Sequence, residues 1–349
     1  MAAVIETDAL VIGAGPVGLF QVFQLGLQGI AAQVVDVLDR AGGQCIELYA
    51  DKPIYDIPAV PVCTGRTLTR NLLSQIAPFN PAFHFGQQVS SLEHQIDGRW
   101  LVATQRHQKP CQQFLARTVF IAAGVGAFVP KELKVDGVAD FLGRQFFYQS
   151  AASDILAGKN VVIVGGEDAA VAVALALTQP GPNQAGRVTL VHRRDVLQAS
   201  NTDLTHFTAL RQAGHIHFQA GQVTAVDAAD GQLHGVEIST PADETLHLPL
   251  DVLLVCWGLS PKLGPLTQWG LAMERKQLSV STETFATNEP GIFAVGDVVT
   301  YPGKKKLIVC GFHEATLAAF AAAKHLHPDD SASLQYTTSS ALLQQRLGV

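Results

Sequence analysis

Two stretches of the chain share the same order of apolar and glycine residues. An apolar run over 8–12 leads into a glycine-rich turn at 13–18, and an apolar run over 160–164 leads into a similar turn at 165–170. Each turn opens an Ala- and Leu-rich segment with helical character. A short, continuously apolar run that enters a helix through glycines is typical of a buried parallel strand. The repeat predicts two dinucleotide-binding folds in one chain.

The remaining apolar runs place these two folds along the chain. Strand-like segments lie within 84–125 and 215–240, and further apolar runs end near glycines at 258 and 296. We predict an α/β fold of two Rossmann-like, three-layer nucleotide-binding domains, the second inserted into the first. Boundaries near Gly124–Gly126 and Leu250 give a first domain of 1–125 and 251–349 and an inserted domain of 126–250. The polar stretch 336–349 is either a frayed tail or a structured one.

The first glycine turn has the spacing of a dinucleotide site. Gly13 permits the tight turn, Gly15 lets a pyrophosphate reach the backbone, and Gly18 allows close helix–strand packing. The helix amino end offers free N–H groups and a positive dipole end to the phosphates. Asp36 ends the next apolar run, where a carboxylate accepts hydrogen bonds from ribose hydroxyls and repels a 2′-phosphate. The site therefore predicts FAD or NAD rather than NADP, unless Asp36 is a plain surface acid.

Other residues of the first domain extend this site. Gly42-Gly43-Gln44 predicts a loop whose backbone approaches a ligand, with an ordinary turn as the alternative. Asp297 offers a second carboxylate at a strand end. The segment 311–315 opens an Ala-rich helix, and we expect its positive end to face a flavin ring and stabilise the reduced anion.

The matching strand end in the second unit carries cations. His192, Arg193 and Arg194 stand where Asp36 stands in the first unit. Arginine forks match a phosphate, so the sequence predicts NADP rather than NAD here, with a solvated arginine pair as the alternative. Glu167 replaces the middle glycine, where a carboxylate disfavours a pyrophosphate. Either Glu167 points away or the dinucleotide binds more weakly or in a different way.

Composition narrows the function classes. The 349 residues are 48% hydrophobic and 15% charged, enough for about two domains with sizeable cores. A net charge of −6 argues against a nucleic-acid binder. Five scattered cysteines without a CxxC pair predict free thiols in a reducing cytosol, with neither a dithiol centre nor a metal site. We expect no secretory leader and no membrane span, and hence a cytoplasmic, soluble protein.

Together these motifs resemble the pyridine nucleotide–disulfide oxidoreductase superfamily and, within it, ferredoxin–NADP reductases of the thioredoxin-reductase-like type. The similarity covers nearly the whole chain. The glycine motifs are shared across the superfamily, whereas the Tyr-x-Gly-Lys loop and the aromatic tail are more specific. The segments that carry it are 13–20, 42–44, 48–49, 121–128, 192–195, 291–297, 300–304, 311–315 and 336–340.

The resemblance implies two cofactor sites. The implied FAD site comprises Gly13, Gly15, Val17, Gly18, Asp36, Gln44, Tyr49, Val89, Phe128, Asp297 and Thr338. The implied NADP site comprises Gly165, Gly166, Ala170, His192, Arg193 and Arg194. Tyr49 is expected to stack on one face of the isoalloxazine. The C-terminal tail is expected to cross to the partner subunit and lay Tyr336 over the other face, which implies a homodimer. No catalytic acid or base beyond the flavin is required.

The chain departs from thioredoxin reductases at the redox dithiol. They carry a CxxC just before the second nucleotide unit, and the matching stretch 146–153 has no cysteine. No thiolate pair is therefore available there to take electrons from the flavin. The resemblance implies direct transfer to a one-electron carrier, ferredoxin or flavodoxin. An acidic ferredoxin needs a basic docking patch, for which 304–306, Arg66 and Arg70 are candidates.

Two alternatives stay open. One is an NAD(P)H-dependent flavin reductase that uses a quinone, free flavin or a thioredoxin-like protein as acceptor. The other is a non-catalytic FAD-binding module with a decayed NADP site. Glu167 and Gln198 favour the latter, because the family usually has glycine at the first position and thioredoxin reductases have a phosphate-binding arginine at the second. The family also usually has serine where Ala169 stands. The sequence names neither the physiological acceptor nor the direction of electron flow.

Overall fold

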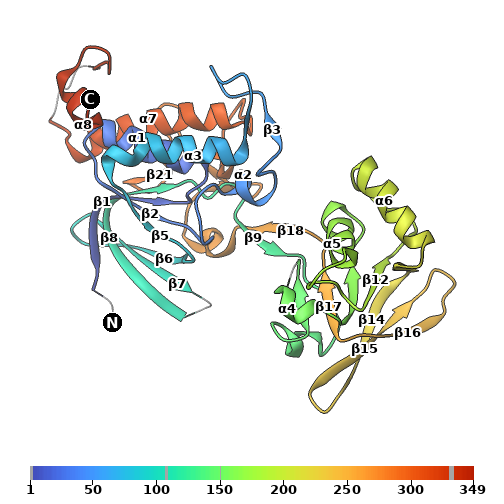
Figure 1. The fold of residues 1–349 in the computed structure, drawn as a ribbon. Coiled ribbons are helices and arrows are strands. Elements are labelled where there is room, and N and C mark those ends of the chain that lie inside the picture. Colours follow the sequence, from blue (N-terminus) through green and yellow to red (C-terminus); the bar gives the residue numbers. More distant parts are fainter. Residues whose placement is uncertain (1–2, 107–108, 150, 330–333) are drawn as a thin grey trace. The chain divides into compact units, whose positions relative to one another are not determined.

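The chain forms two compact units in the computed structural model, which describes residues 3–106, 109–149, 151–329 and 334–349 (Figure 1). Unit 1 combines 1–127 with 261–349, and unit 2 is the continuous segment 128–260. Each unit is built on a sheet with parallel strands and packed helices. The predicted α/β class is confirmed.

Unit 1 is built on a seven-stranded sheet in the order β5-β2-β1-β8-β7-β6, with β21 also paired to β8. Five of its strands pair in parallel, and β6 and β7 join antiparallel. The strands are β1 (Ile5–Ile12), β2 (Ala32–Val35), β5 (Ala82–His84), β6 (Gln88–His94), β7 (Trp100–Arg106), β8 (Lys109–Ile121) and β21 (Ile292–Ala294).

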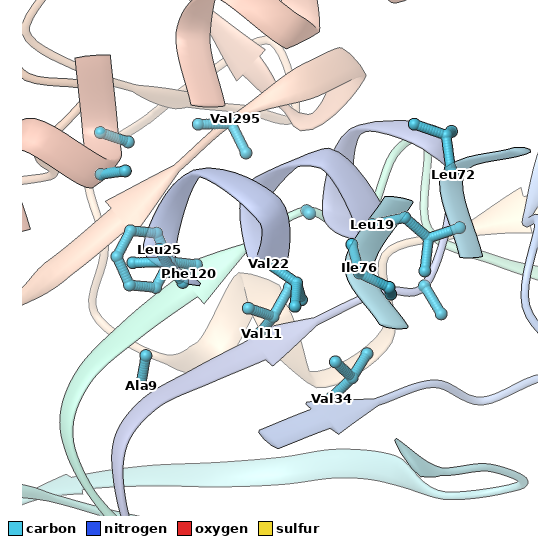
Figure 2. Close-up of a cluster of buried hydrophobic side chains, with 14 of the residues drawn as sticks. Ala9, Val11, Leu19, Val22, Leu25, Val34, Leu72, Ile76, Phe120 and Val295 are labelled. Carbon is cyan, nitrogen blue, oxygen red and sulfur yellow. The ribbon is translucent and has the colours of Figure 1, made fainter. Parts of the chain in front are cut away.

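Side chains of β1 alternate between the two faces of this sheet, and its second half, residues 9–12, is buried on both sides. Ala9 and Val11 join a core with α1 (Pro16–Leu27), α3 (Gly65–Ile76) and α7 (Ile308–Leu326), shown in Figure 2. Leu10 and Ile12 join a second core with β6, β7 and residues from 266 to 299. The three helices lie side by side over one face of the sheet (Figure 1).

Shorter elements complete unit 1. They are α2 (Gln44–Glu47), β3 (Pro53–Ile54), β4 (Cys63–Thr64), η1 (Ala77–Phe79), η3 (Gly264–Gln268), β19 (Met273–Glu274), β20 (Gln277–Ser279), η4 (Gly296–Val298), β22 (Val299–Thr300) and α8 (Ala341–Leu347). Strands β19, β20 and β22 form a small sheet of their own.

The end of the chain is structured rather than frayed. Ser340 caps α8 by accepting a hydrogen bond from the amide of Leu343, whose side chain is buried. Arg346 donates a hydrogen bond to the carbonyl of Leu27 at the end of α1. Of the two alternatives for 336–349, the structured one is correct for α8.

Unit 2 is built on a five-stranded parallel sheet in the order β10-β17-β11-β12-β13. Helices α5 and α6 pack with one face, and a three-stranded antiparallel sheet packs with the other. The elements are η2 (Val138–Phe141), β10 (Phe146–Tyr148), α4 (Ser153–Leu156), β11 (Asn160–Val164), α5 (Asp168–Thr178), β12 (Arg187–His192), α6 (Asn201–Gln212), β13 (Ile216–Ala220), β14 (Gln222–Ala229), β15 (Gln232–Ser239), β16 (Thr245–Pro249) and β17 (Val252–Val255).

Strand β17 lies beyond the domain boundary that we predicted near Leu250, but it pairs with β10 and β11 inside this sheet. Unit 2 therefore extends to Ser260. The chain enters unit 2 along β9 (Ala127–Pro130) and leaves it along β18 (Leu259–Lys262). None of the helices in the described part of the chain combines the length and apolar character that a bilayer span requires.

Candidate functional site

The turn between β1 and α1 requires two of its glycines for steric reasons. Gly13 has φ +110°, and a Cβ there would overlap the carbonyl of Ala122. A Cβ on Gly18 would overlap the carbonyl of Gly13. Gly15 is different, because the nearest heavy atom to its ideal Cβ is Gly43 Cα at 4.0 Å. Space beside Gly15 is thus open, which is the condition for a ligand to reach its backbone.

A second glycine loop faces this turn. The amide of Gly42 donates a 2.9 Å hydrogen bond to the carbonyl of Ala14, and a Cβ on Gly43 would lie 3.1 Å from Gly15 Cα. Gly15 is the N-cap of α1, and no side chain among the described residues caps this helix end. The result is a cradle lined by backbone at a helix amino end, which fits a pyrophosphate.

Asp36 follows β2 directly and is tied to the same turn. Its Oδ2 accepts a 2.6 Å hydrogen bond from the amide of Ala14, and its Oδ1 accepts a 2.8 Å bond from the amide of Leu38. The residue is only 8% exposed. Burial raises the pKa of its carboxyl, and the two amide bonds oppose that rise. Asp36 is therefore not a plain surface acid.

An open pocket of about 600 Å³ begins one residue beyond Asp36. It is lined by Val37, Asp39, Phe85, Gly86, Gln88, Gln105 and Arg106. Each carboxylate oxygen of Asp36 keeps lone-pair capacity for one more donor.

Gln44 and Asp297 meet although they are 253 positions apart in the sequence. Gln44 is the first residue of α2, and its Nε2 donates a 3.2 Å hydrogen bond to Asp297 Oδ2. A Cβ on Gly124 would lie 3.3 Å from the same Nε2. The side chain of Val17 packs beside Gly296, the neighbour of Asp297. The structure therefore brings four separately predicted segments to one place.

A buried carboxylate that sequence reasoning missed stands beside Asp297. Glu314 on α7 is fully buried, and its Oε2 accepts a 2.6 Å hydrogen bond from the amide of Gly296. Its Oε1 accepts a 2.7 Å hydrogen bond from the hydroxyl of Tyr301 and forms an ion pair with Lys304. A charged residue in an otherwise Ala-rich helix was the available signal.

Lys304 cannot belong to the predicted docking patch. Its side chain is only 6% exposed because it is paired with Glu314, so that part of the prediction is wrong. Lys305 and Lys306 are exposed. Arg66 is exposed and forms a two-pronged ion pair with Asp51, with distances of 3.1 Å. Arg70, the remaining member of the predicted set, is exposed.

The predicted ring-stacking residues differ in setting. Tyr49 is half-buried and accepts a hydrogen bond from Cys45 Sγ at 3.4 Å. Burial raises the pKa of the Tyr49 hydroxyl, so it stays protonated. Tyr336 is 64% exposed, and Thr338 beside it is also exposed.

Three further expectations concern the surroundings of this site. Val89 is 4% exposed, and its side chain packs in the core of unit 1. The side chain of Phe128 lies outside the described part of the structure. Helix α7 begins at Ile308, so 311–315 lies within the helix instead of opening it.

The glycine turn of unit 2 is packed more tightly. A Cβ on Gly165 would lie 2.6 Å from the carbonyl oxygen of Cys256 and 2.7 Å from the Cβ of Ala170, which is fully buried. A Cβ on Gly166 would lie 2.5 Å from Nδ1 of His192. The imidazole therefore rests directly against this turn.

Glu167 lies at the N-cap of α5 and is exposed, and its side chain does not cap the helix within the described residues. The carbonyl before it, on Gly166, accepts a 2.7 Å hydrogen bond from the amide of Gln198. The exposed side chain leaves Glu167 free to turn towards solvent.

Arg193 and Arg194 are exposed, and neither is in an ion pair within the described ranges. The neighbouring Asp195 does not neutralise them, because it binds Arg211 through two contacts of 2.8 and 2.9 Å. Burial lowers the pKa of His192, and Arg193 and Arg194 lower it further. The strand end thus presents two unneutralised guanidinium groups beside a neutral imidazole.

The sequence profile of the pyridine nucleotide-disulphide oxidoreductase family matches residues 7–316, most of the chain. The chain belongs to this family.

Relatives within the pyridine nucleotide-disulphide oxidoreductases share much of the sequence. The ferredoxin–NADP reductase of Paracidovorax citrulli is 57% identical over 355 positions, covering 100% of this chain and 98% of its own. The ferredoxin–NADP reductase of Albidiferax ferrireducens is 56% identical over 345 positions, covering 99% and 96%.

Solved structures support the same fold. Thioredoxin reductase from T. acidophilum has a TM-score of 0.60 at 20% identity, covering 91% of this chain and 98% of its own. Bacillithiol disulfide reductase from Staphylococcus aureus has a TM-score of 0.63 at 16% identity, covering 91% and 98%.

In this pyridine nucleotide-disulphide oxidoreductase all five cysteines are free thiols. Burial raises the pKa of Cys45 and Cys63, and it raises the pKa of Cys256 to about 11. These three thiols therefore stay protonated and unreactive at neutral pH. Within the described residues, no group of three His, Cys, Asp or Glu side chains is placed to hold a metal ion.

Proposed function

We propose that this protein is an FAD-dependent ferredoxin–NADP reductase, which moves electrons between NADPH and ferredoxin without a redox dithiol. The observation that carries the proposal is the 57% identity, over the full length of both chains, to a ferredoxin–NADP reductase. Two glycine turns with opposite charges at the following strand end support it, because they suit two different dinucleotides.

Unit 1 fits FAD. The pyrophosphate would lie on the cradle of Gly13, Gly15 and Gly43, where the amino end of α1 offers unpaired amides. Gly18 supports this cradle by packing closely against the carbonyl of Gly13, and Val17 supports it by packing beside Gly296. Asp36 would accept hydrogen bonds from the adenosine ribose, with the adenine in the adjoining pocket and the backbone of Val89 beside it.

Gln44 and Asp297 would hold the ribityl and pyrophosphate region, since their hydrogen bond already fixes both side chains. Tyr49 would stack on one face of the ring system as a neutral phenol. We assign Tyr336 and Thr338 to the other face, in the site of a second subunit, and Phe128 to the flavin surroundings. The exposure of Tyr336 supports this assignment, and the assignment implies a homodimer.

Unit 2 fits NADP. Gly165, Gly166 and Ala170 form the close strand-to-helix turn, and Arg193 and Arg194 would bind the 2′-phosphate. His192 would remain neutral and pack against the turn. When bound, FAD supplies the chemistry of the reaction, because it accepts a hydride and releases electrons one at a time. The side chains of this chain bind and orient the two dinucleotides.

The electron acceptor would dock through charge. Lys305, Lys306 and Arg70 are exposed cations on unit 1 that suit an acidic ferredoxin, and a flavodoxin would use the same surface. We place the enzyme in the cytoplasm, since its free thiols persist in a reducing compartment.

Anaerobic titration of the purified protein tests the proposal. We expect a yellow protein whose flavin is bleached by stoichiometric NADPH and more slowly by NADH. Addition of oxidised ferredoxin, and separately of flavodoxin, should restore the oxidised flavin spectrum. A colourless protein that refuses FAD, or a flavin that stays oxidised in NADPH, would overturn the proposal. Reoxidation by quinone but by neither carrier would assign a different acceptor.

A further inference from the structure

An ion pair between Lys304 and Glu314 joins the Tyr301–Lys304 loop to helix α7, and the proposed function does not use it. Lys304 and Glu314 are 6% and 0% exposed, and removing both charges from water is costly unless every polar atom is satisfied. Here the carboxylate has three partners: Lys304, the Tyr301 hydroxyl and the amide of Gly296. A buried carboxylate with three partners acts as a fixed connection and not as a surface contact.

The carboxylate joins three segments that are separate in sequence. Gly296 belongs to η4 and immediately precedes Asp297, the partner of Gln44. Tyr301 and Lys304 belong to the loop that runs into the first turn of α7. Glu314 itself lies on α7, in a helix face otherwise formed by small residues such as Ala315 and Ala318. Any shift of the carboxylate therefore moves the turn that carries Asp297.

Tyr301 strengthens this connection through packing. Its ring contacts Phe285 edge-on, with centroids 5.6 Å apart, and the ammonium of Lys304 lies 5.5 Å from the Tyr301 ring centroid. Burial and the adjacent carboxylate raise the pKa of the Tyr301 hydroxyl, so it remains a donor. Ring, ammonium and carboxylate hold one another in a single arrangement.

We propose that Glu314 is a positioning residue for the FAD site: paired with Lys304 and Tyr301, it fixes the Gly296–Asp297 turn and the entry of α7. The proposal rests on FAD binding to unit 1, as the proposed function has it. Because Glu314 is fully buried, it acts through Asp297 and the hydrogen bond of Asp297 to Gln44.

The test measures FAD binding to the apoprotein of the full chain, together with the thermal midpoint and the visible circular dichroism of bound flavin. Glu314→Gln keeps an acceptor for the Gly296 amide but leaves the Lys304 ammonium buried without a counter-charge. We expect it to raise the FAD dissociation constant about tenfold or more and to alter the flavin dichroism. The double variant Glu314→Gln/Lys304→Met removes both charges and should recover much of the loss.

Thr118→Val is the matched control. Thr118 is buried in β8 of the same unit and donates a 2.7 Å hydrogen bond to the carbonyl of Asp8, with no link to Asp297. It should lower the thermal midpoint without changing the FAD dissociation constant or the flavin dichroism. Should Glu314→Gln behave like this control, Glu314 is merely structural and the inference is overturned.

Tyr301→Phe decides the matter if Glu314→Gln does not fold. It removes one hydrogen bond and keeps the ring, and we expect about a threefold weaker FAD affinity. Wild-type FAD affinity and dichroism in Tyr301→Phe would then overturn the inference. A wild-type apoprotein that fails to bind FAD would overturn the proposed function itself, so the two failures are distinguishable.

Discussion

Oδ2 of Asp36 accepts a 2.6 Å hydrogen bond from the amide of Ala14, in the middle of the glycine turn. The carboxylate thus shapes the turn in addition to its proposed contact with the ribose. In Asp36→Asn an NH₂ group replaces one of the two oxygens. The side chain can then accept only one of the two hydrogen bonds from the amides of Ala14 and Leu38. We expect the free energy of unfolding to fall by about 1–3 kcal/mol and FAD to bind at least about tenfold more weakly.

Urea unfolding of the apoprotein and FAD titration measure these two effects. Asp97→Asn is the control, because Asp97 also accepts a backbone hydrogen bond, 3.0 Å from the Arg99 amide, but is exposed. Equal FAD affinity in both variants would show that Asp36 is only structural.

The two glycines at positions 15 and 18 should respond in opposite ways to a methyl group. Gly18→Ala places Cβ on the carbonyl of Gly13, so we expect unfolded or insoluble protein. Gly15→Ala has space for its Cβ and a φ of −71°, so the apoprotein should fold with an unchanged thermal midpoint but lose FAD. Circular dichroism and flavin content distinguish these outcomes. Retention of FAD by Gly15→Ala would move the pyrophosphate away from this cradle.

Arg193 and Arg194 should set the choice of dinucleotide. Replacing both with alanine removes the charges expected to meet the 2′-phosphate, so KM for NADPH should rise by about 10- to 100-fold while KM for NADH changes little. Dye reduction with each nucleotide measures both constants. Arg187→Ala is the matched control, because Arg187 is an exposed arginine at the opposite end of β12. An equal rise for NADPH and NADH would reject the phosphate contact.

The pKa of His192 makes stability depend on pH. Burial, with Arg193 and Arg194, lowers this pKa in the folded state from its ordinary 6.5. As the pH falls through 6.5, His192 takes up a proton in the unfolded chain but stays neutral in the native state. The free energy of unfolding therefore decreases. We expect the free energy of unfolding to fall more steeply for wild type than for His192→Gln between about pH 7.5 and 5.5. Parallel curves from urea unfolding would contradict this.

Lys305 and Lys306 are the testable part of the docking patch. Reversing both to glutamate should raise KM for an acidic ferredoxin about tenfold at low salt, and the effect should fade as salt is added. Reduction of a small neutral dye should stay at the wild-type rate. Lys324→Glu is the control, because Lys324 is exposed in the last turn of α7, whereas Lys305 and Lys306 precede the first turn of that helix. Equal losses with dye and ferredoxin would reject the patch.

What the sequence predicted correctly follows from local rules. Gly13 and Gly18 predict a strand-to-helix turn, because the backbone of such a turn leaves no room for a side chain at these positions. The apolar run of β11 likewise predicts a strand buried on both faces.

What escaped prediction depends on partners distant in sequence. Lys304 looks like its exposed neighbours until the fold brings Glu314 to it. The second role of Asp36 depends on an amide 22 positions away. The helix α8 has only seven residues, and it is held by Arg346 against the end of α1. Pattern alone does not reveal such tertiary contacts.

The pairing of β21 with β8 has a consequence for biosynthesis. Phe293 lies in register with Phe120, yet all of unit 2 is translated between them. Unit 2 is continuous, so its nascent segment contains every strand that it needs while unit 1 still lacks β21 and α7. We expect the later-started unit to mature first on the ribosome. Until translation passes residue 294, the apolar edge of β8 over residues 119–121 lacks its partner strand β21, and we expect this edge to be a target for chaperones.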